Sequence, residues 1–218
     1  MQTYSHTVIT AALIKPARAL ADGRPNRWPR VRTGALLIGS FLPDLPLILM
    51  TVAAIALDIQ SGVFRQIQNG PPGAGGGSSL TMRLFDVYFF ENPWVIAFHN
   101  LFHSPVLLAL YLLIGYGLWR RGIRGGDWFF WLAAAAMFHT LLDIPLHTDD
   151  GPLLLFPLNW RWRFHSPVSY WDPAHYGREW AAFEHLLDLG LLLYLAGRYR
   201  RPARAWLHTR RQAKKTIG

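Results

Sequence analysis

The sequence predicts an all-α membrane helix bundle with four full spans and an N-terminal helix that spans or half-spans the bilayer. Of the 218 residues, 51% are hydrophobic and only 16% are charged, and several apolar runs approach the roughly 20 residues that cross a bilayer. Basic segments alternate with nearly neutral ones, as they do in polytopic membrane proteins. Ten Trp and thirteen Phe suit aromatic belts at the two membrane surfaces. The length fits a single domain over residues 1–218.

The first two expected helices lie in the N-terminal quarter of the chain. Tyr4–Leu20 carries Lys15 and Arg18 near its end, where long basic side chains can reach the membrane surface. Gly34–Leu57 is long enough to span, but Pro43-Asp44-Leu45-Pro46 interrupts it. Two prolines and a carboxylate in an apolar run predict a broken helix, whose freed backbone groups need a cavity or protein partners.

Three further spans follow. Asn92-Pro93 has the residue types of an N-cap and a first helical position. A helix is therefore expected from there to about Trp119, with a kink near Pro105. Trp128–Leu146 and Phe183–Tyr199 are the remaining apolar runs of sufficient length.

The net charge of +9 is concentrated in the segments 15–33, 119–127 and 197–218. The positive-inside rule places these segments in the cytoplasm. The expected protein lies in a bacterial inner membrane with an extracytoplasmic N-terminus, a flexible outer loop at 69–79 and a basic cytoplasmic tail at 200–218. A basic tail that binds nucleic acid is the alternative, but the alternation of charge favours a lipid bilayer and no nucleic acid. No cleavable signal peptide is expected, because the first apolar run is short and precedes the basic residues.

This topology gathers polar residues of the spans on one side of the membrane. The hydrocarbon core disfavours carboxylates and imidazoles, so such groups normally line an interior site. Asp44 falls at mid-depth. The others fall on the outer, periplasmic side: His6, His103, His139, Asp143, His147 and Glu184.

His139, Asp143 and His147 recur every four residues, which predicts three metal-ligand types on one face of one helix. The chain has no Cys, so a metal must be held by His, Asp or Glu. Imidazole with carboxylate suits Zn²⁺, Mn²⁺ or Fe²⁺. The alternative is a buried His–Asp hydrogen-bond pair that stiffens the bundle. Asp149 and Asp150 could orient His147 or form a polar turn.

Three other positions are candidate ligands. His99 and His103 are four apart, and His103 is favoured because Ser104-Pro105 fixes the chain there. His99 could ligate, contact substrate or form an interfacial pair. Asp44 needs a cation or several donors at its depth, with stabilisation of the kink as the alternative. His6 is a candidate through the topology alone.

A second tier of polar residues lies in the same outer region. Arg161 and Arg163 could hold an anionic substrate such as a phosphate, or they could anchor the chain at the interface. The segment 102–106 recurs as 164–168, and in both copies Ser-Pro can cap a helix. The other second-tier residues are Asp172, His175, Glu184, His185 and Asp188.

The order of these motifs resembles that of the membrane-bound metal-dependent hydrolases, a group of inner-membrane proteins. More distantly it is similar to the fold of zinc-dependent phospholipase C and single-strand nucleases, which is helical and holds up to three zinc ions with His and Asp ligands. The family's His-Arg-Gly-x-Thr-His-Ser is shorter by one residue here and lacks the Arg and Gly, and Leu45-Pro46 stand where many relatives have Asp or His. The matching pieces are His6, Leu42-Pro43-Asp44, His99 to Ser104, and His139 with Asp143.

The resemblance and the residues together predict metal-dependent hydrolysis of a phosphoester, with a lipid as one substrate class. One to three ions of zinc, or of another divalent metal, would be the cofactor, and Asp44 would be a ligand or the base that takes a proton from water. One alternative is a non-catalytic subunit with membrane-protein partners and a degenerate site. Another is bis-His haem ligation, for instance by His103 and His139, against which Asp44 and Asp143 argue. The expected ligands are His6, Asp44, His103, His139, Asp143 and His147.

Overall fold

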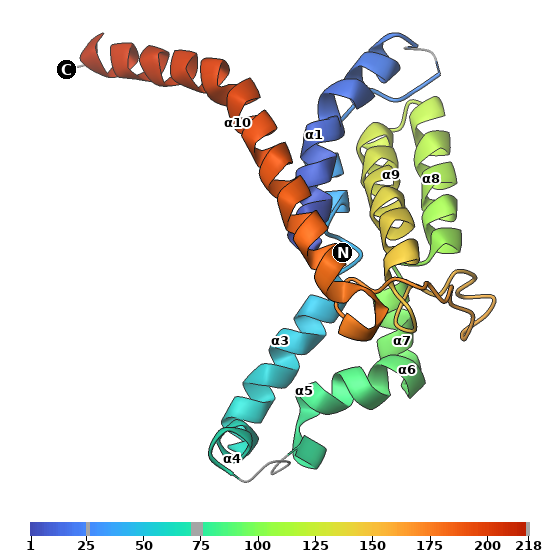
Figure 1. Ribbon diagram of the computed structural model, residues 1–218. Helices are drawn as coiled ribbons and strands as arrows, with labels where there is room; N and C mark the ends of the chain where they lie inside the picture. The colour runs from blue at the N-terminus through green and yellow to red at the C-terminus, as the bar shows by residue number, and fades with distance from the viewer. Residues whose placement is uncertain (25–26, 71–75, 217–218) are drawn as a thin grey trace.

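Helices form the architecture of the protein in a computed structural model, which describes residues 1–24, 27–70 and 76–216 (Figure 1). Over these residues the only β pairing is an isolated bridge between Leu153 and Arg163. Two helices, Gly126–Leu146 and Gly177–Arg200, are long and apolar enough to cross a membrane, and the number rises to four if each of two bent pairs is one span. An all-α fold is therefore confirmed for the described residues, with two to four helices or bent helix pairs that could cross a membrane.

Ten α-helices, three 3₁₀ helices and one π-helix follow one another within the described residues. They are α1 (Thr3–Asp22), α2 (Thr33–Gly39), α3 (Leu45–Gln60), α4 (Val63–Asn69), η1 (Gly76–Ser78), α5 (Leu80–Arg83), η2 (Leu84–Tyr88), α6 (Phe89–Glu91), α7 (Pro93–Asn100), α8 (Pro105–Arg120), α9 (Gly126–Asp143), η3 (Ile144–Leu146), η4 (Pro173–His175) and α10 (Gly177–Thr216).

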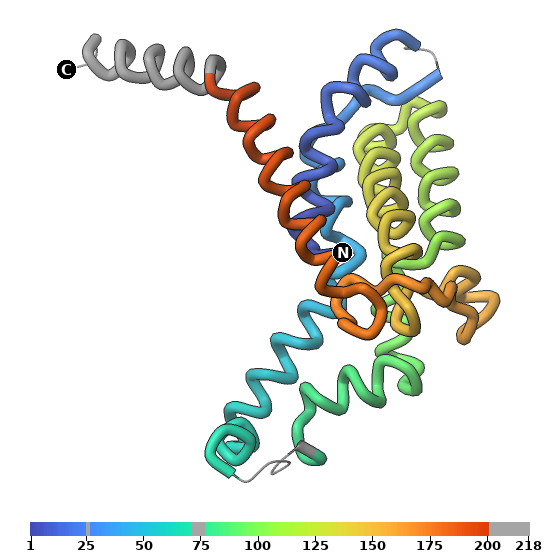
Figure 2. The backbone as a smooth tube through the Cα atoms, viewed as in Figure 1, coloured from blue at the N-terminus to red at the C-terminus, as the bar shows by residue number. Residues whose placement is uncertain are grey.

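The helices form two groups. Figures 1 and 2 show α1, α2, α8, α9 and the first part of α10 side by side, whereas α3 to α6 extend from the other end of this bundle. Small residues allow close helix contacts in the bundle. A Cβ on Gly115 of α8 would lie 2.7 Å from the Phe130 Cα of α9. The core between α1, α2 and α9 is apolar and consists of Ile14, Ala21, Val31, Leu36 and Ala135.

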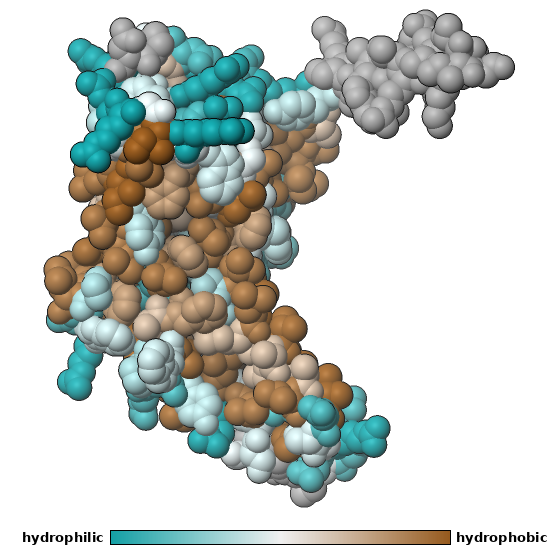
Figure 3. Space-filling model, turned by 180° about the vertical axis from the view of Figure 1, so that it is seen from behind, coloured by the Kyte–Doolittle hydropathy of each residue, from teal (hydrophilic) through white to brown (hydrophobic). Residues whose placement is uncertain are grey.

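Basic residues collect at the end of the bundle that lies away from α3 to α6. Figure 3 shows hydrophilic residues at this end, above a predominantly apolar body. The turns that meet there are the one between α1 and α2 and the one between α8 and α9. Their exposed basic residues are Arg24, Arg27, Arg30, Arg32, Arg120, Arg121 and Arg124. Two of the three segments predicted to be cytoplasmic, 15–33 and 119–127, therefore meet at one end of the bundle.

The proline-rich interruption breaks the second expected helix. α2 ends at Gly39, the chain turns through residues 40–44, and α3 begins at Leu45 with Pro46 in its first turn. The two halves do not continue in one line, because α2 packs on α9 whereas α3 leads away from the bundle. The expectation of one span over Gly34–Leu57 is thus replaced by a bent pair, α3 with α4, at an angle of 78°.

The next helix begins and bends as expected. The Asn92 side chain accepts hydrogen bonds from the Trp94 and Val95 backbone N–H groups, which caps α7. α7 and α8 meet at 43° just before Pro105. Ser104 precedes α8, but its hydroxyl donates to the Phe156 carbonyl at 2.7 Å and does not cap the helix. In the second copy of this motif, no helix follows Ser166.

α9 is one turn shorter than the His139–Asp143–His147 spacing predicts. Pro145 cannot continue the hydrogen-bond ladder, so α9 ends at Asp143 and η3 follows. His147 has extended backbone angles, φ −129° and ψ 121°. The prediction that it lies on the same helix face is wrong.

The long connection between α9 and α10 folds back over α7 and α8. The buried Asn100 side chain accepts from the Leu153 N–H at 3.0 Å, and Leu153 packs with Ile96 and Phe156. Asn100 and Ser104 of the His99–Ser104 segment thus hold this connection. Of the expected outer loop at 69–79, residues 71–75 lie outside the described chain. The expected tail at 200–218 continues α10 to Thr216.

Candidate metal centre

Four metal-ligand side chains meet where the bundle joins α3. Each offers one ligand atom, and these atoms all lie within 4.8 Å of one another. α9 supplies two of them on successive turns, and the turns before α3 and α8 supply one each. They are Asp44, His103, His139 and Asp143, and they are called the Asp–His cluster below.

The end of α2 fixes the orientation of His139. The His139 Nδ1 lies 2.7 Å from the backbone carbonyl of Ser40, so this nitrogen carries the proton and donates it. The Nε2 is then unprotonated in the neutral ring and points toward the cluster. A ring nitrogen held in this way by a carbonyl is the usual arrangement of a metal-binding His. The ring is completely buried.

His99 contacts the Nδ1 of His103 in a similar arrangement. The His103 Nδ1 and the His99 Nε2 are 3.3 Å apart. If the His103 Nδ1 donates, its Nε2 is free for the cluster and His99 is the acceptor. His99 is not among the four cluster residues, so the structure places it behind His103.

The two cluster imidazoles converge without being hydrogen-bonded there. His139 Nε2 lies 3.0 Å from Asp143 Oδ2 and 3.4 Å from Asp44 Oδ1, and His103 Nε2 lies 3.3 Å from Asp143 Oδ2. Neither nitrogen has a hydrogen-bond partner, although both are buried. A buried polar atom without an aligned hydrogen bond is costly, and a cation between the nitrogens and the carboxylates would relieve that cost. The donor set of two imidazoles and two carboxylates fits a divalent ion such as zinc.

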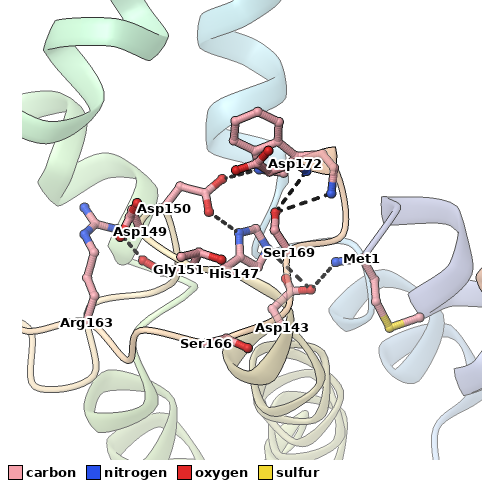
Figure 4. Close-up of polar contacts among 12 residues, drawn as sticks. Met1, Asp143, His147, Asp149, Asp150, Gly151, Arg163, Ser166, Ser169 and Asp172 are labelled. Carbon is pink, nitrogen blue, oxygen red and sulfur yellow. Dashed lines mark hydrogen bonds and ion pairs between the residues drawn. The ribbon is translucent and has the colours of Figure 1, made fainter. Parts of the chain in front are cut away.

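The N-terminal residues close the cluster from the side of α1. His6 stacks on His139 with ring centroids 3.6 Å apart, and its Nε2 lies 3.0 Å from Asp143 Oδ1. The Met1 amino nitrogen donates to the same oxygen at 2.7 Å (Figure 4). His6 is therefore beside the cluster and shares a carboxylate oxygen with Met1.

His147 approaches Asp143 from the opposite side, as Figure 4 shows. Its Nδ1 lies 2.9 Å from Asp150 Oδ1, and its Nε2 lies 3.8 Å from Asp143 Oδ1. Burial alone would raise the pKa of Asp150, but hydrogen bonds from His147 and Trp171 and the His147 charge hold its pKa below the usual value. Burial, followed by the charge of Asp150, raises the pKa of Tyr170, whose ring lies beside His147. The Asp150 carboxylate thus orients His147 so that its Nε2 points toward the cluster.

Asp44 is the most accessible member of the cluster. Its side chain is 19% exposed, compared with 2% for Asp143. The Thr3 hydroxyl donates to Asp44 Oδ2 at 2.5 Å, which leaves Oδ1 toward His139. A pocket of about 880 Å³ adjoins the cluster, and Asp44, His103 and Asp143 are part of its lining. A molecule in this pocket can reach the cluster on the Asp44 side.

The second-tier residues lie at various distances from this centre. Glu184 is buried and accepts from the Gln2 N–H at 2.7 Å, so it positions the start of α1. Asp149 pairs with His165 on the surface, and Asp172 pairs with His175. Arg161 is exposed. Arg163 is buried, donates to the Gly151 carbonyl and lies over the Phe89 ring. Gln2 and Phe89 line the pocket beside the cluster, but none of the second-tier residues does.

Four groups that matter here were not expected from the sequence. The Ser40 carbonyl orients His139, the Thr3 hydroxyl orients Asp44, and the Met1 nitrogen binds Asp143. No sequence pattern marks such partners. Asp58, near the end of α3, is the fourth. The sequence does mark this residue, because a carboxylate in a largely apolar run needs hydrogen-bond donors.

Comparison with known proteins identifies a family match. The family model described as YdjM inner membrane protein covers residues 1–209. No curated protein matches. No solved structure matches either, so the expected likeness to the phospholipase C fold gains no support.

Proposed function

The chain belongs to the YdjM inner membrane protein family, and from that setting we propose that the Asp–His cluster is a divalent-metal site for hydrolysis of a phosphoester. The observation that carries this proposal is the pair of buried, unpartnered Nε2 atoms of His103 and His139, which converge on two carboxylates. Groups of this kind inside a membrane protein normally serve a functional site.

The residues have separable roles toward such an ion. Asp143, His103 and His139 are ligands, because they are buried and their orientation is fixed by neighbouring groups. The cluster as it stands accommodates one ion. A second ion would need His6 or His147, whose Nε2 is 3.8 Å from Asp143 Oδ1. A divalent ion supplies a Lewis acid that polarises a phosphoryl group and acidifies water.

Asp44 is the residue best placed to take a proton from water. It is the most exposed cluster member and it faces the adjoining pocket. The Thr3 hydroxyl occupies its Oδ2, so Oδ1 is the atom available as a ligand or as a base. Leu45-Pro46, where the resembled family often has a further acidic residue or His, start α3. The site therefore relies on Asp44 alone on this side.

Bis-His haem does not suit this geometry. His103 Nε2 and His139 Nε2 both lie within 3.3 Å of Asp143 Oδ2, and their ring centroids are 5.2 Å apart. The carboxylate occupies the space between the rings where a macrocycle would have to lie.

One observation favours a second function, a non-catalytic membrane protein with an internal polar network. The Met1 amino group donates to Asp143 at 2.7 Å and gives this carboxylate a cationic partner. In that case the cluster would be a packing network that needs no ion.

Metal content separates the two functions. We expect purified wild-type protein to contain near-stoichiometric zinc, or another divalent metal, by elemental analysis, and Asp143→Ala to lose it. Asp127→Ala is the matched control, because Asp127 lies at the other end of α9 and pairs with Arg32. Wild-type protein that contains no ion after growth with added zinc, and binds none afterwards, would leave only the packing network.

A further inference from the structure

The pocket beside the Asp–His cluster is polar at one end and apolar along its walls. Its polar end consists of cluster residues with His99, His147 and Asp150. One wall is α3 and the opposite wall is η2 with α6, two segments that are far apart in the sequence. Its volume of about 880 Å³ lies in the range of small-molecule sites. The wall residues include Ile48, Thr51, Val52, Phe85, Phe89 and Phe90.

The walls are mostly apolar and partly uncovered, although Asp86 of η2 also lines the pocket. Ile48 is 41% exposed, Val52 60%, Phe85 42% and Phe90 44%. Thr51, the polar wall residue of α3, donates its hydroxyl to the Leu47 carbonyl at 2.8 Å, so it presents its methyl group without an unmet donor. Figure 3 shows that the part of the molecule formed by α3 to α6 is predominantly apolar. An apolar wall that continues from a charged cluster matches a ligand with a charged head and an alkyl chain.

The second wall contains an unusual helical segment. η2 is a π-helix over Leu84–Tyr88, and Phe85 is one of its residues. One-turn π segments occur often at functional sites, because the extra residue widens the turn and redirects side chains. The result here is that Phe85, Phe89 and Phe90 form the wall that faces α3.

We propose that the substrate is an anionic amphiphile, an alkyl or acyl phosphoester whose head lies against the Asp–His cluster and whose chain lies between α3 and η2. This inference rests on the proposed function. Four carboxylates, Asp44, Asp86, Asp143 and Asp150, line the pocket, and the Met1 amino group offsets only the one that it contacts, Asp143. An anionic head therefore binds there only when a further cation offsets the remaining charge. The alkyl chain requires no such ion, since its contribution to binding comes from apolar contact.

Binding of two probes that differ only in chain length tests the proposal. The probes are dodecyl phosphate and methyl phosphate, titrated by calorimetry into protein in lipid nanodiscs, with zinc or after chelation, and with empty nanodiscs subtracted. We expect dodecyl phosphate to bind zinc-loaded protein at least about tenfold more tightly than methyl phosphate, because its chain becomes buried. Chelation of zinc should weaken the binding of dodecyl phosphate by about tenfold or more. Equal binding of the two probes would overturn the proposal.

Two tryptophan variants locate the chain. Val52→Trp narrows the pocket and should remove most of the chain-length advantage, whereas zinc content and methyl phosphate binding stay unchanged. Leu57→Trp is the matched control, since Leu57 is 49% exposed on the same helix and does not line the pocket. If both variants, or neither, weaken the binding of dodecyl phosphate, its alkyl chain does not lie between α3 and η2.

Hydrolysis separates this inference from the proposed function. Dodecyl and methyl 4-nitrophenyl phosphate share one leaving group, and attack of water on phosphorus releases 4-nitrophenolate and leaves the alkyl phosphate. Cleavage of both esters at equal kcat/KM would support the proposed hydrolysis and overturn the proposal that the substrate is an amphiphile. Zinc-dependent dodecyl phosphate binding without cleavage of either ester would support the amphiphile site and overturn the hydrolase.

Discussion

His139 of α9 donates its Nδ1–H to the Ser40 carbonyl at the end of α2, over 2.7 Å. This contact joins a residue of the Asp–His cluster to the broken helix that also supplies Asp44, four residues later. The position of α2 on α9 therefore sets the orientation of one candidate ligand and the position of another.

Gly39→Ala should weaken stability and metal affinity together. A Cβ at Gly39 would clash with the Leu132 carbonyl oxygen and lie 2.9 Å from the Ala135 Cβ, so α2 must move off α9. Overpacking of this kind costs roughly 1–3 kcal/mol. We expect a lower melting temperature and weaker zinc binding. Gly34→Ala on the same helix meets nothing within 4 Å and should change neither property. Tight zinc binding by Gly39→Ala would show that α2 does not position the cluster.

His99→Ala should lower metal affinity although His99 is outside the cluster. Without the acceptor at 3.3 Å, the His103 ring loses its fixed orientation, and loss of such a partner typically costs about 10–100-fold in affinity. His99→Gln keeps an acceptor and should recover part of the loss, which a purely structural role would not require. His165→Ala, at an exposed His, is the control. Competition with a coloured chelator measures the affinities.

Removal of the ion should destabilise the wild-type protein. Binding to the folded state alone contributes about 2.7 kcal/mol when the free ion is at 100 times its Kd. A chelator should therefore lower the melting temperature, and added zinc should restore it. Asp143→Ala should show no response to the chelator. A melting temperature that is insensitive to the chelator in both proteins would favour the packing network.

Asp58→Ala should open the amphiphile pocket without affecting the metal. The buried Asp58 carboxylate at the end of α3 accepts from the Ser79 hydroxyl and from the Leu80 and Thr81 N–H groups, at 2.8–2.9 Å. It thus ties α3 to the start of α5, and its loss should cost roughly 2–3 kcal/mol. We expect a lower melting temperature and weaker dodecyl phosphate binding at unchanged zinc content. Gln60→Ala, at an exposed residue of α3, should leave all three unchanged.

The orientation in the membrane can be tested with single cysteines, because the chain has none. Arg161 lies in the connection before α10, and Arg121 lies at the basic end of the bundle; both are exposed. With the basic end in the cytoplasm, a membrane-impermeant maleimide applied to intact cells should label Arg161→Cys and not Arg121→Cys. Labelling of Arg121→Cys alone would place the cluster near the cytoplasm.

The sequence by itself determined the all-helical character with long apolar helices, the break before α3, the Asn92 cap and the residue types of the cluster. Each depends on local chemistry: apolar length, proline, a capping side chain and the cost of a carboxylate in lipid. Asp44, His103, His139 and Asp143 could be named for that reason.

Only the tertiary structure decided which of the candidates meet. His6, His99 and His147 are the same residue type as His103, but they lie beside the cluster and contact it or its ligands. Their places depend on the end of α9 at Asp143, on the packing of α2 and on backbone groups such as the Ser40 carbonyl. The pocket between α3 and η2 likewise joins segments that no spacing in the sequence relates. Such contacts are non-local and arise from packing, which periodicity and composition do not encode.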